Sequence, residues 1–156
     1  MMTSRLIDQY AAGPSQLRSA VAGMTRDQLI ARPIAGKWST LELVAHIADF
    51  EPVYVDRMKR IIAQHEPTLF GGDPDLFASK LAYHERDINE ELALIDACRT
   101  HMTRILRTLP PEAFERKGIH SENGPMKLEQ ILTNIGNHIS HHLPFLAEKR
   151  KALGLG

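Results

Sequence analysis

The sequence has little of several features that define whole classes of protein. Its one cysteine, Cys98, cannot form an internal disulfide, and there is no second thiol for a CxxC redox or zinc motif. No stretch approaches the roughly 18 continuous apolar residues of a membrane span, and the N-terminus lacks the basic-then-apolar pattern of a secretion signal. We therefore expect a cytoplasmic protein with no membrane partner.

The chain also has no excess of charge of either sign. Nineteen Lys and Arg residues balance nineteen Asp and Glu residues, so the formal net charge is zero. Proteins that bind nucleic acid usually have a basic surface, and this composition therefore predicts no nucleic-acid partner. The ligand expected from this balance is a small molecule or another protein. A length of 156 residues is that of one ordinary domain, so we expect a single domain over residues 1–156.

Apolar residues recur at spacings of three and four throughout the chain, whereas the alternation typical of strands is hard to find. This pattern predicts an all-α protein. A first helical stretch covers Ser4–Val21, and we expect Gly13–Pro14 to interrupt it. Thr25 and Gln28 then have the spacing of a capping box, which opens a short turn that Pro33 ends.

Three longer helices are expected over residues 39–64, from residue 76 to 106, and from residue 126 almost to the C-terminus. Ser39 and Glu42 form a second capping box at the start of the first of these. Pro110–Pro111 prevents the helix over 76–106 from continuing. Four amphipathic helices joined by short loops predict a four-helix bundle, in which binding sites are built from side chains of facing helices.

Three of the eight histidines have positions suited to a metal site. His138 and His142 are four residues apart on one helix, so their rings project from the same face. His46 lies at the edge of the apolar stripe of the helix over 39–64. A divalent ion needs imidazole nitrogens that converge at about 2.0–2.2 Å, and a facing helix supplies the third. Three such ligands leave positions open to water or substrate, as in catalytic sites.

The same spacing also has an ordinary structural interpretation, because two histidines four residues apart on a helix arise readily by chance. In that case these side chains are half-buried or lie on the surface. His141 points about 100° away from His142 and is interpreted as a residue of the second shell or pocket rim. The remaining histidines are interpreted as solvated or loop residues: His65, His84, His101 and His120.

Two segments resemble the DinB-like (YfiT-like) family of metal-binding four-helix bundles. They are GKWSTLELVAHIADFE at 36–51 and HSENGPMKLEQILTNIGNHISHHL at 120–143, and the resemblance extends over nearly the whole chain. It implies an antiparallel-type bundle, a homodimer in many members, and an ion of the nickel, zinc or iron class bound by three histidines. Those positions correspond to His46, His138 and His142. We expect a divalent transition metal, with nickel or zinc ahead of iron or manganese.

Three further residues bear on the expected site. Many members of the family have arginine or glutamine soon after the second histidine, whereas this chain has Pro144, and a kink there would displace His142. Asp49 lies on the same side of its helix as His46 and is either a solvated acid or a residue that orients an imidazole. Arg57 lies about 16 Å along the same face, where it would hold a substrate carboxylate at the pocket mouth.

The resemblance implies three functional hypotheses. The first is a metal-dependent transferase that uses a low-molecular-weight thiol as cosubstrate, and the second is a metal-dependent hydrolase. The third is a metal-binding helical dimer without catalytic activity. The sequence identifies no general base and therefore no catalytic residue. If the histidines lay apart, a helical dimer without metal would remain.

Overall fold

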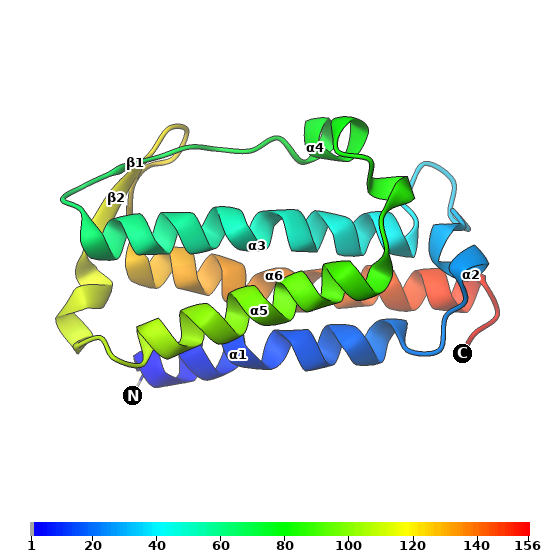
Figure 1. The fold of residues 1–156 in the computed structure, drawn as a ribbon, viewed down its shortest axis with the longest axis horizontal. Coiled ribbons are helices and arrows are strands. Elements are labelled where there is room, and N and C mark those ends of the chain that lie inside the picture. The colour runs from blue at the N-terminus through cyan, green and yellow to red at the C-terminus, as the bar shows by residue number, and fades with distance from the viewer. Residues whose placement is uncertain (1) are drawn as a thin grey trace.

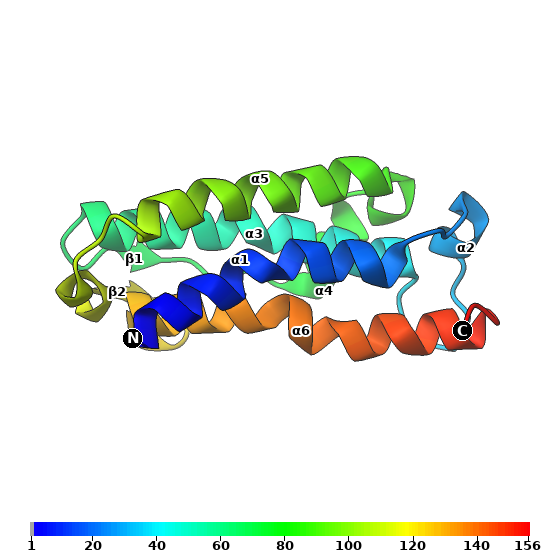
Figure 2. The ribbon, with the colours of Figure 1, turned by 90° about the horizontal axis from the view of Figure 1, so that it is seen from below.

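The computed structural model describes residues 2–156, and its framework is a four-helix bundle, as expected. The long helices are α1 (Met2–Val21), α3 (Thr40–Ala63), α5 (Ile88–Leu106) and α6 (Leu128–Ala152). Helices α1 and α6 run in one direction and α3 and α5 in the other (Figure 1). Seen from below, α1 lies between α5 and α6 (Figure 2). Within the described residues, no helix is long and apolar enough to cross a membrane.

Both predicted capping boxes are present, and they set where α2 and α3 begin. Ser39 Oγ accepts a hydrogen bond from the Glu42 amide at 3.0 Å, and the Glu42 carboxylate accepts one from the Ser39 amide at 3.0 Å. The same reciprocal bonds between Thr25 and Gln28 open the short helix α2 (Arg26–Ile30). The start of α3 fixes His46 two turns into the helix.

The prediction of one helix over 76–106 is wrong, because the helical structure is interrupted twice in this region. Helix α4 (Pro74–Lys80) ends before a single 3-10 turn, η1 (Tyr83–Glu85), and α5 then begins at Ile88. Ala82 adopts a left-handed conformation with φ 54°, which no α-helix accommodates. Asp87 caps α5 by accepting hydrogen bonds from the amides of Asn89 and Glu90.

A small sheet, which was not predicted, accompanies the helices of the bundle. Strand β1 (Thr68–Leu69) pairs in parallel with β2 (Lys117–His120), which forms an antiparallel hairpin with β3 (Gly124–Lys127). A 3-10 helix, η2 (Pro111–Glu115), precedes β2. The sheet joins the start of the α3–α5 crossover to the segment before α6, at the bundle end where α3 finishes (Figure 1). Strands of two to four residues are too short to show an alternating pattern.

Helix α1 continues through Gly13–Pro14, so the expected interruption is also wrong. Pro14 has no amide hydrogen to donate to the carbonyl of Tyr10. That carbonyl instead accepts a hydrogen bond of 2.7 Å from Arg99 Nη1 of α5. A Cβ atom on Gly13 would lie 2.6 Å from the same Arg99 nitrogen. The glycine provides the space and the proline frees the acceptor that one buried arginine needs.

Arg99 connects all four long helices at the centre of the bundle. Its Nε and Nη2 atoms donate to the carboxylate of Glu51 on α3 at 2.7–3.0 Å, and Nη2 also donates to the Ile135 carbonyl of α6 at 2.9 Å. The side chains of Arg99 and Glu51 are 1% and 0% exposed. Two clusters of buried apolar side chains fill the bundle on either side of the pair. One includes Met58, Met102 and Ile131, and the other includes Leu17, Val44 and Ile47.

We expect Arg99→Met to destabilise the protein by about 3–5 kcal/mol, because it leaves the Glu51 carboxylate buried without its partner. Urea unfolding followed by circular dichroism measures this change. Arg107→Met is the control, since Arg107, the residue that directly follows α5, pairs with Asp8 at the surface and its loss costs about 0–1 kcal/mol. Equal effects of the two substitutions would show that the buried pair does not stabilise the bundle.

Substitution by alanine is expected to change the stability of the protein in opposite directions at two glycines of the long helices. Gly13→Ala destabilises by about 1–3 kcal/mol, because the added methyl meets Arg99 and the Ile139 side chain at 2.6–2.9 Å. Gly136→Ala meets nothing closer than the Tyr10 amide at 4.0 Å, so its higher helix propensity stabilises by up to about 1 kcal/mol. Thermal unfolding of both variants tests the pair, and a stabilised Gly13→Ala would contradict the close approach of Arg99.

Candidate metal centre

Helices α3 and α6 are antiparallel, and this arrangement brings the three predicted histidines together. His46 Nε2 lies 3.0 Å from His138 Nε2, which lies 3.2 Å from His142 Nε2. One nitrogen atom from each ring lies within 4.8 Å of the others. Helix α6 continues through Pro144, and His142 keeps its place in the cluster. The histidines therefore converge from two helices on one point.

The donor set fits a transition metal ion. Two imidazoles that share an ion through bonds of about 2.0–2.1 Å, at angles of about 90–110°, have nitrogens about 2.8–3.4 Å apart. The separations of 3.0 and 3.2 Å lie in this range. No carboxylate or thiolate of residues 2–156 joins the group, so the histidines alone supply the ligands. Three ligands leave room for water or substrate on an ion.

Burial keeps the three histidines in the form that binds metal. It lowers the pKa of His138 to about 3 and that of His142 to about 4, and neighbouring histidines add to both shifts. Burial also lowers the pKa of His46, which is 6% exposed. At neutral pH each imidazole is therefore uncharged and has a lone pair available for coordination.

Aromatic rings hold His46 in place where hydrogen bonds do not. The Nδ1 atoms of His46, His138 and His142 are buried and have no hydrogen-bond partner within residues 2–156. Trp38 and Phe50 instead lie against the His46 ring, with centroids 5.3 and 5.1 Å away. Both aromatic residues therefore contact the cluster directly.

The structure places Asp49 beside the site without a hydrogen bond to any histidine. Its two carboxylate oxygens accept hydrogen bonds from Arg86, at 2.5 and 2.9 Å. The same guanidinium also pairs with Glu91 at the start of α5. Asp49 therefore joins the η1 region to α3 and α5. Its negative charge still favours the protonated form of His46, although the effect of burial is larger.

His141 and Arg57 lie in different places relative to the cluster. The His141 ring is exposed at the rim, 5.0 Å from the His142 ring and 5.6 Å from that of Phe145. Arg57 is buried, donates to the Phe70 carbonyl at 2.6 Å, and lines a hollow that contains none of the three histidines. The structure thus brings His141 to the cluster and does not bring Arg57 there.

The four remaining histidines lie outside the cluster. His65, His84 and His101 are exposed, as expected. His120 differs, because it is 6% exposed and its Nδ1 accepts hydrogen bonds from the amides of Glu122 and Asn123. It stabilises the turn between β2 and β3, so the interpretation of His120 as a solvated residue is wrong.

A pocket of about 450 Å³ connects His142 to the surface. Trp38 and Phe145 form part of its apolar lining, and Lys149 contributes a polar group. A hollow of about 740 Å³ lies between α1 and α5 and contains no histidine. Of these two, only the smaller pocket has a histidine of the cluster in its lining.

Comparison with known proteins identifies the family. The sequence profile of the DinB superfamily matches residues 9–146. The chain belongs to the DinB superfamily. The solved structure of YfiT from Bacillus subtilis, described as having an unusual four-helix bundle topology, superposes with a TM-score of 0.90 at 25% sequence identity. The match covers 99% of this chain and 89% of that chain, and it confirms the predicted fold.

Relatives in this superfamily carry the provisional name of metal-dependent hydrolase. A Bacillus licheniformis protein is 28% identical over 149 residues, which are 95% of this chain and 85% of the relative. An Oceanobacillus iheyensis protein is 27% identical over 140 residues, 88% of this chain and 81% of the relative. YfiT of Bacillus subtilis is 27% identical over 142 residues, 90% and 80% of the two chains. These names and the histidine cluster favour a divalent metal in this DinB protein.

Two residues around the site were not predicted from the sequence. Phe77 of α4 stacks on Phe50 with centroids 5.2 Å apart, so the crossover between α3 and α5 covers one side of the site. Lys149 lines the pocket from the last turn of α6 and is only 4% exposed. Lys149 follows His142 by seven residues, or two helical turns. This spacing places both residues on one face of the helix, so the sequence did contain a signal for Lys149.

We expect the metal-free protein to lose stability as the pH falls from about 7 to about 4. The pKa of His138 is about 3 in the folded state and 6.5 in the ordinary exposed state, so the unfolded chain binds more protons between these values. Stability therefore rises with pH across this window and is lost as the pH falls. Each unit of such a shift corresponds to about 1.4 kcal/mol.

Urea unfolding across this pH range measures the effect. His138→Gln should flatten the dependence, whereas His101→Gln, which changes an exposed histidine of α5, should leave it as it is. The burial argument fails if His138→Gln and the unaltered protein have the same slope.

Proposed function

We propose that this DinB protein is a metal-dependent hydrolase that binds one divalent ion through His46, His138 and His142. The observation that carries the proposal is the convergence of three uncharged Nε2 atoms, one of which belongs to His142 in the lining of a pocket. The provisional names of the relatives support hydrolysis over the thiol transfer expected first from the sequence. The resemblance and the all-nitrogen ligand set favour zinc or nickel over iron or manganese.

The chemistry that such an ion supplies is Lewis-acid activation of water or of a substrate oxygen. The protein contributes the surroundings. Trp38 and Phe50 cover the His46 ring, and Phe77 extends this apolar cover from α4. Exclusion of bulk water by these rings strengthens every electrostatic interaction at the cluster.

The polar groups near the cluster limit the candidates for proton transfer. The Asp49 carboxylate accepts two hydrogen bonds from Arg86, so its role is structural and it is not the candidate for proton transfer. His141 lies at the exposed rim, next to His142, where it can exchange protons with solvent. We propose His141 as the group that accepts or delivers a proton during hydrolysis.

We expect His46→Ala and His142→Ala each to abolish near-stoichiometric metal binding, because each removes one of three ligands. Elemental analysis of tag-free protein purified without added metal measures this. Circular dichroism should show nearly unchanged helical content. His101→Ala is the matched control on an exposed surface and should retain the metal. Metal that is absent from the unaltered protein, or that is retained by both ligand variants, would contradict the site.

The reaction class is tested on the metal-loaded protein with p-nitrophenyl acetate as probe. Hydrolysis should stop with a chelator, return with zinc or nickel, and be absent in His46→Ala. A parallel assay with 2-mercaptoethanol and an electrophilic chloroarene measures thiol transfer. Metal-dependent transfer without hydrolysis would replace our proposal with the transferase hypothesis.

A further inference from the structure

A buried lysine in the pocket beside His142 has no partner. Lys149 is 4% exposed, although charged side chains are rarely buried to this degree without a counter-charge. Within residues 2–156 its ammonium group makes no hydrogen bond or ion pair, and burial lowers its pKa. The next residue, Arg150, donates to the Ala22 carbonyl at 2.9 Å. Its ammonium nitrogen keeps contact with solvent, so a lysine whose stem is buried presents a positive charge without a partner to the pocket.

The geometry of α6 directs Lys149 toward the histidine cluster. Seven residues separate it from His142, which is about two turns and about 10.5 Å along the helix axis. Both residues therefore lie on one face, and side chains of a helix lean toward its N-terminus. The Lys149 side chain thus extends back along α6 in the direction of His142, and both residues line the same pocket.

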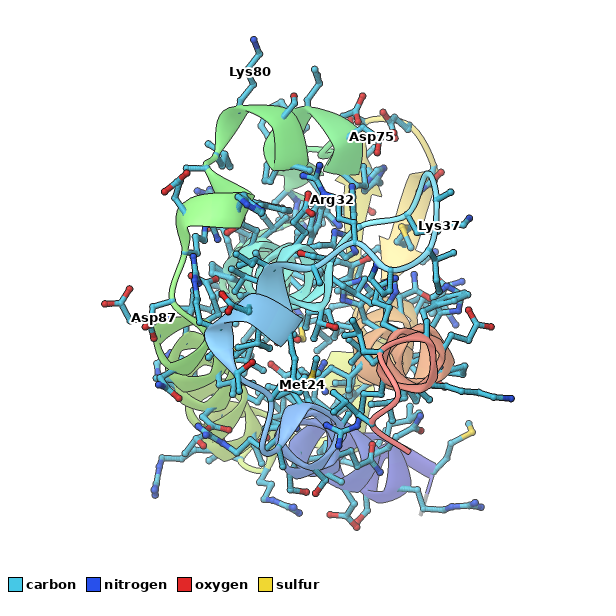
Figure 3. All side chains as sticks on the ribbon, turned by 90° about the vertical axis from the view of Figure 1, so that its right-hand side faces the viewer. Met24, Arg32, Lys37, Asp75, Lys80 and Asp87 are labelled. Carbon is cyan, nitrogen blue, oxygen red and sulfur yellow. The ribbon has the colours of Figure 1, made fainter. Side chains whose placement is uncertain are left out.

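The other charged groups of the pocket are exposed. Lys37 lies in the segment between α2 and α3, and Asp75 lies in α4 across from it (Figure 3). Glu148 is the second carboxylate of the lining. Lys37, Asp75 and Glu148 are exposed to solvent, which screens their charges, whereas the Lys149 side chain is 4% exposed. Glu148 and Glu42 attract its charge, but neither forms an ion pair with it. The ammonium of Lys149 is therefore the least exposed charge that lines the pocket.

We propose that Lys149 binds an oxyanion of the substrate, a carboxylate or a phosphate, with Lys37 assisting at the pocket mouth. The substrate of the hydrolase is then an anionic small molecule whose other end reaches the three histidines. This assignment of substrate class rests on the proposed function, whereas the oxyanion subsite itself does not need the metal. Lysine is a point-charge donor with three hydrogens and suits both kinds of oxyanion.

The only tryptophan of the chain, Trp38, lines the same pocket and reports its occupancy. We would titrate the 15N-labelled, metal-free protein with inorganic phosphate and, separately, with acetate at constant ionic strength. The indole N–H resonance of Trp38 should shift saturably with at least one of them. K149Q should weaken this binding at least tenfold, K149R should retain it, and K151Q, on the exposed side of the same turn, should bind as the unaltered protein does.

The two anions distinguish a phosphate subsite from a carboxylate subsite. No saturable shift with either anion, or equal binding by K149Q and the unaltered protein, would overturn the proposal. Circular dichroism of K149Q and of K149M, a second uncharged variant with an apolar stem, ensures that a lost response reflects the charge and not the fold. Zinc stoichiometry measured on the same samples is independent, so a failure of the metal site is recognised separately.

Discussion

The arrangement of the bundle depends on the buried ion pair between Arg99 and Glu51. One guanidinium contacts a carboxylate of α3 and backbone carbonyls of α1 and α6, so the four long helices meet at a single side chain. Glu51 follows His46 by five residues, and Ile135 precedes His138 by three. The contacts that align α3 with α6 thus lie about one turn from the histidines and help to set the distance between them.

The pair also explains two residues that are unfavourable inside a helix. Glycine and proline each weaken a helix in isolation. In α1 they occur together at positions 13 and 14, where a Cβ atom would collide with Arg99 and an amide hydrogen would compete for the Tyr10 carbonyl. The local cost of both residues is therefore offset by full hydrogen bonding of a buried charge, without which the guanidinium would be strongly destabilising.

The features that could be predicted from the sequence are those determined by local spacing. Capping boxes depend on residues three apart, and the placement of His138 beside His142 depends on one helical turn. The pairing of Arg99 with Glu51 spans 48 residues, and no local rule identifies it. A charged residue within the apolar stripe of each helix was the available signal, but it does not name the partner.

The missed elements have similar causes. The strands have only two to four residues, and β1 pairs with β2 from Thr68 to Ile119, far along the chain, so only the folded chain shows the sheet. The break before α5 depends on the left-handed conformation of Ala82, a residue that seldom adopts it. Asp49 seemed free to orient a histidine because its partner, Arg86, was expected inside a continuous helix. Because that helix is divided, Arg86 lies beside α3 and donates two hydrogen bonds to the Asp49 carboxylate.

The charge of the site follows from its ligands. Three neutral imidazoles do not offset the charge of a divalent ion, whereas a site with a carboxylate ligand reduces it. The nearest acid, Asp49, is already neutralised by Arg86, and the buried ammonium of Lys149 adds a further positive group to the pocket. A low-dielectric pocket of this kind favours anionic molecules and stabilises negative charge that develops on a substrate oxygen. The two proposals, hydrolysis at the histidines and oxyanion binding at Lys149, therefore depend on the same positive charge of the pocket.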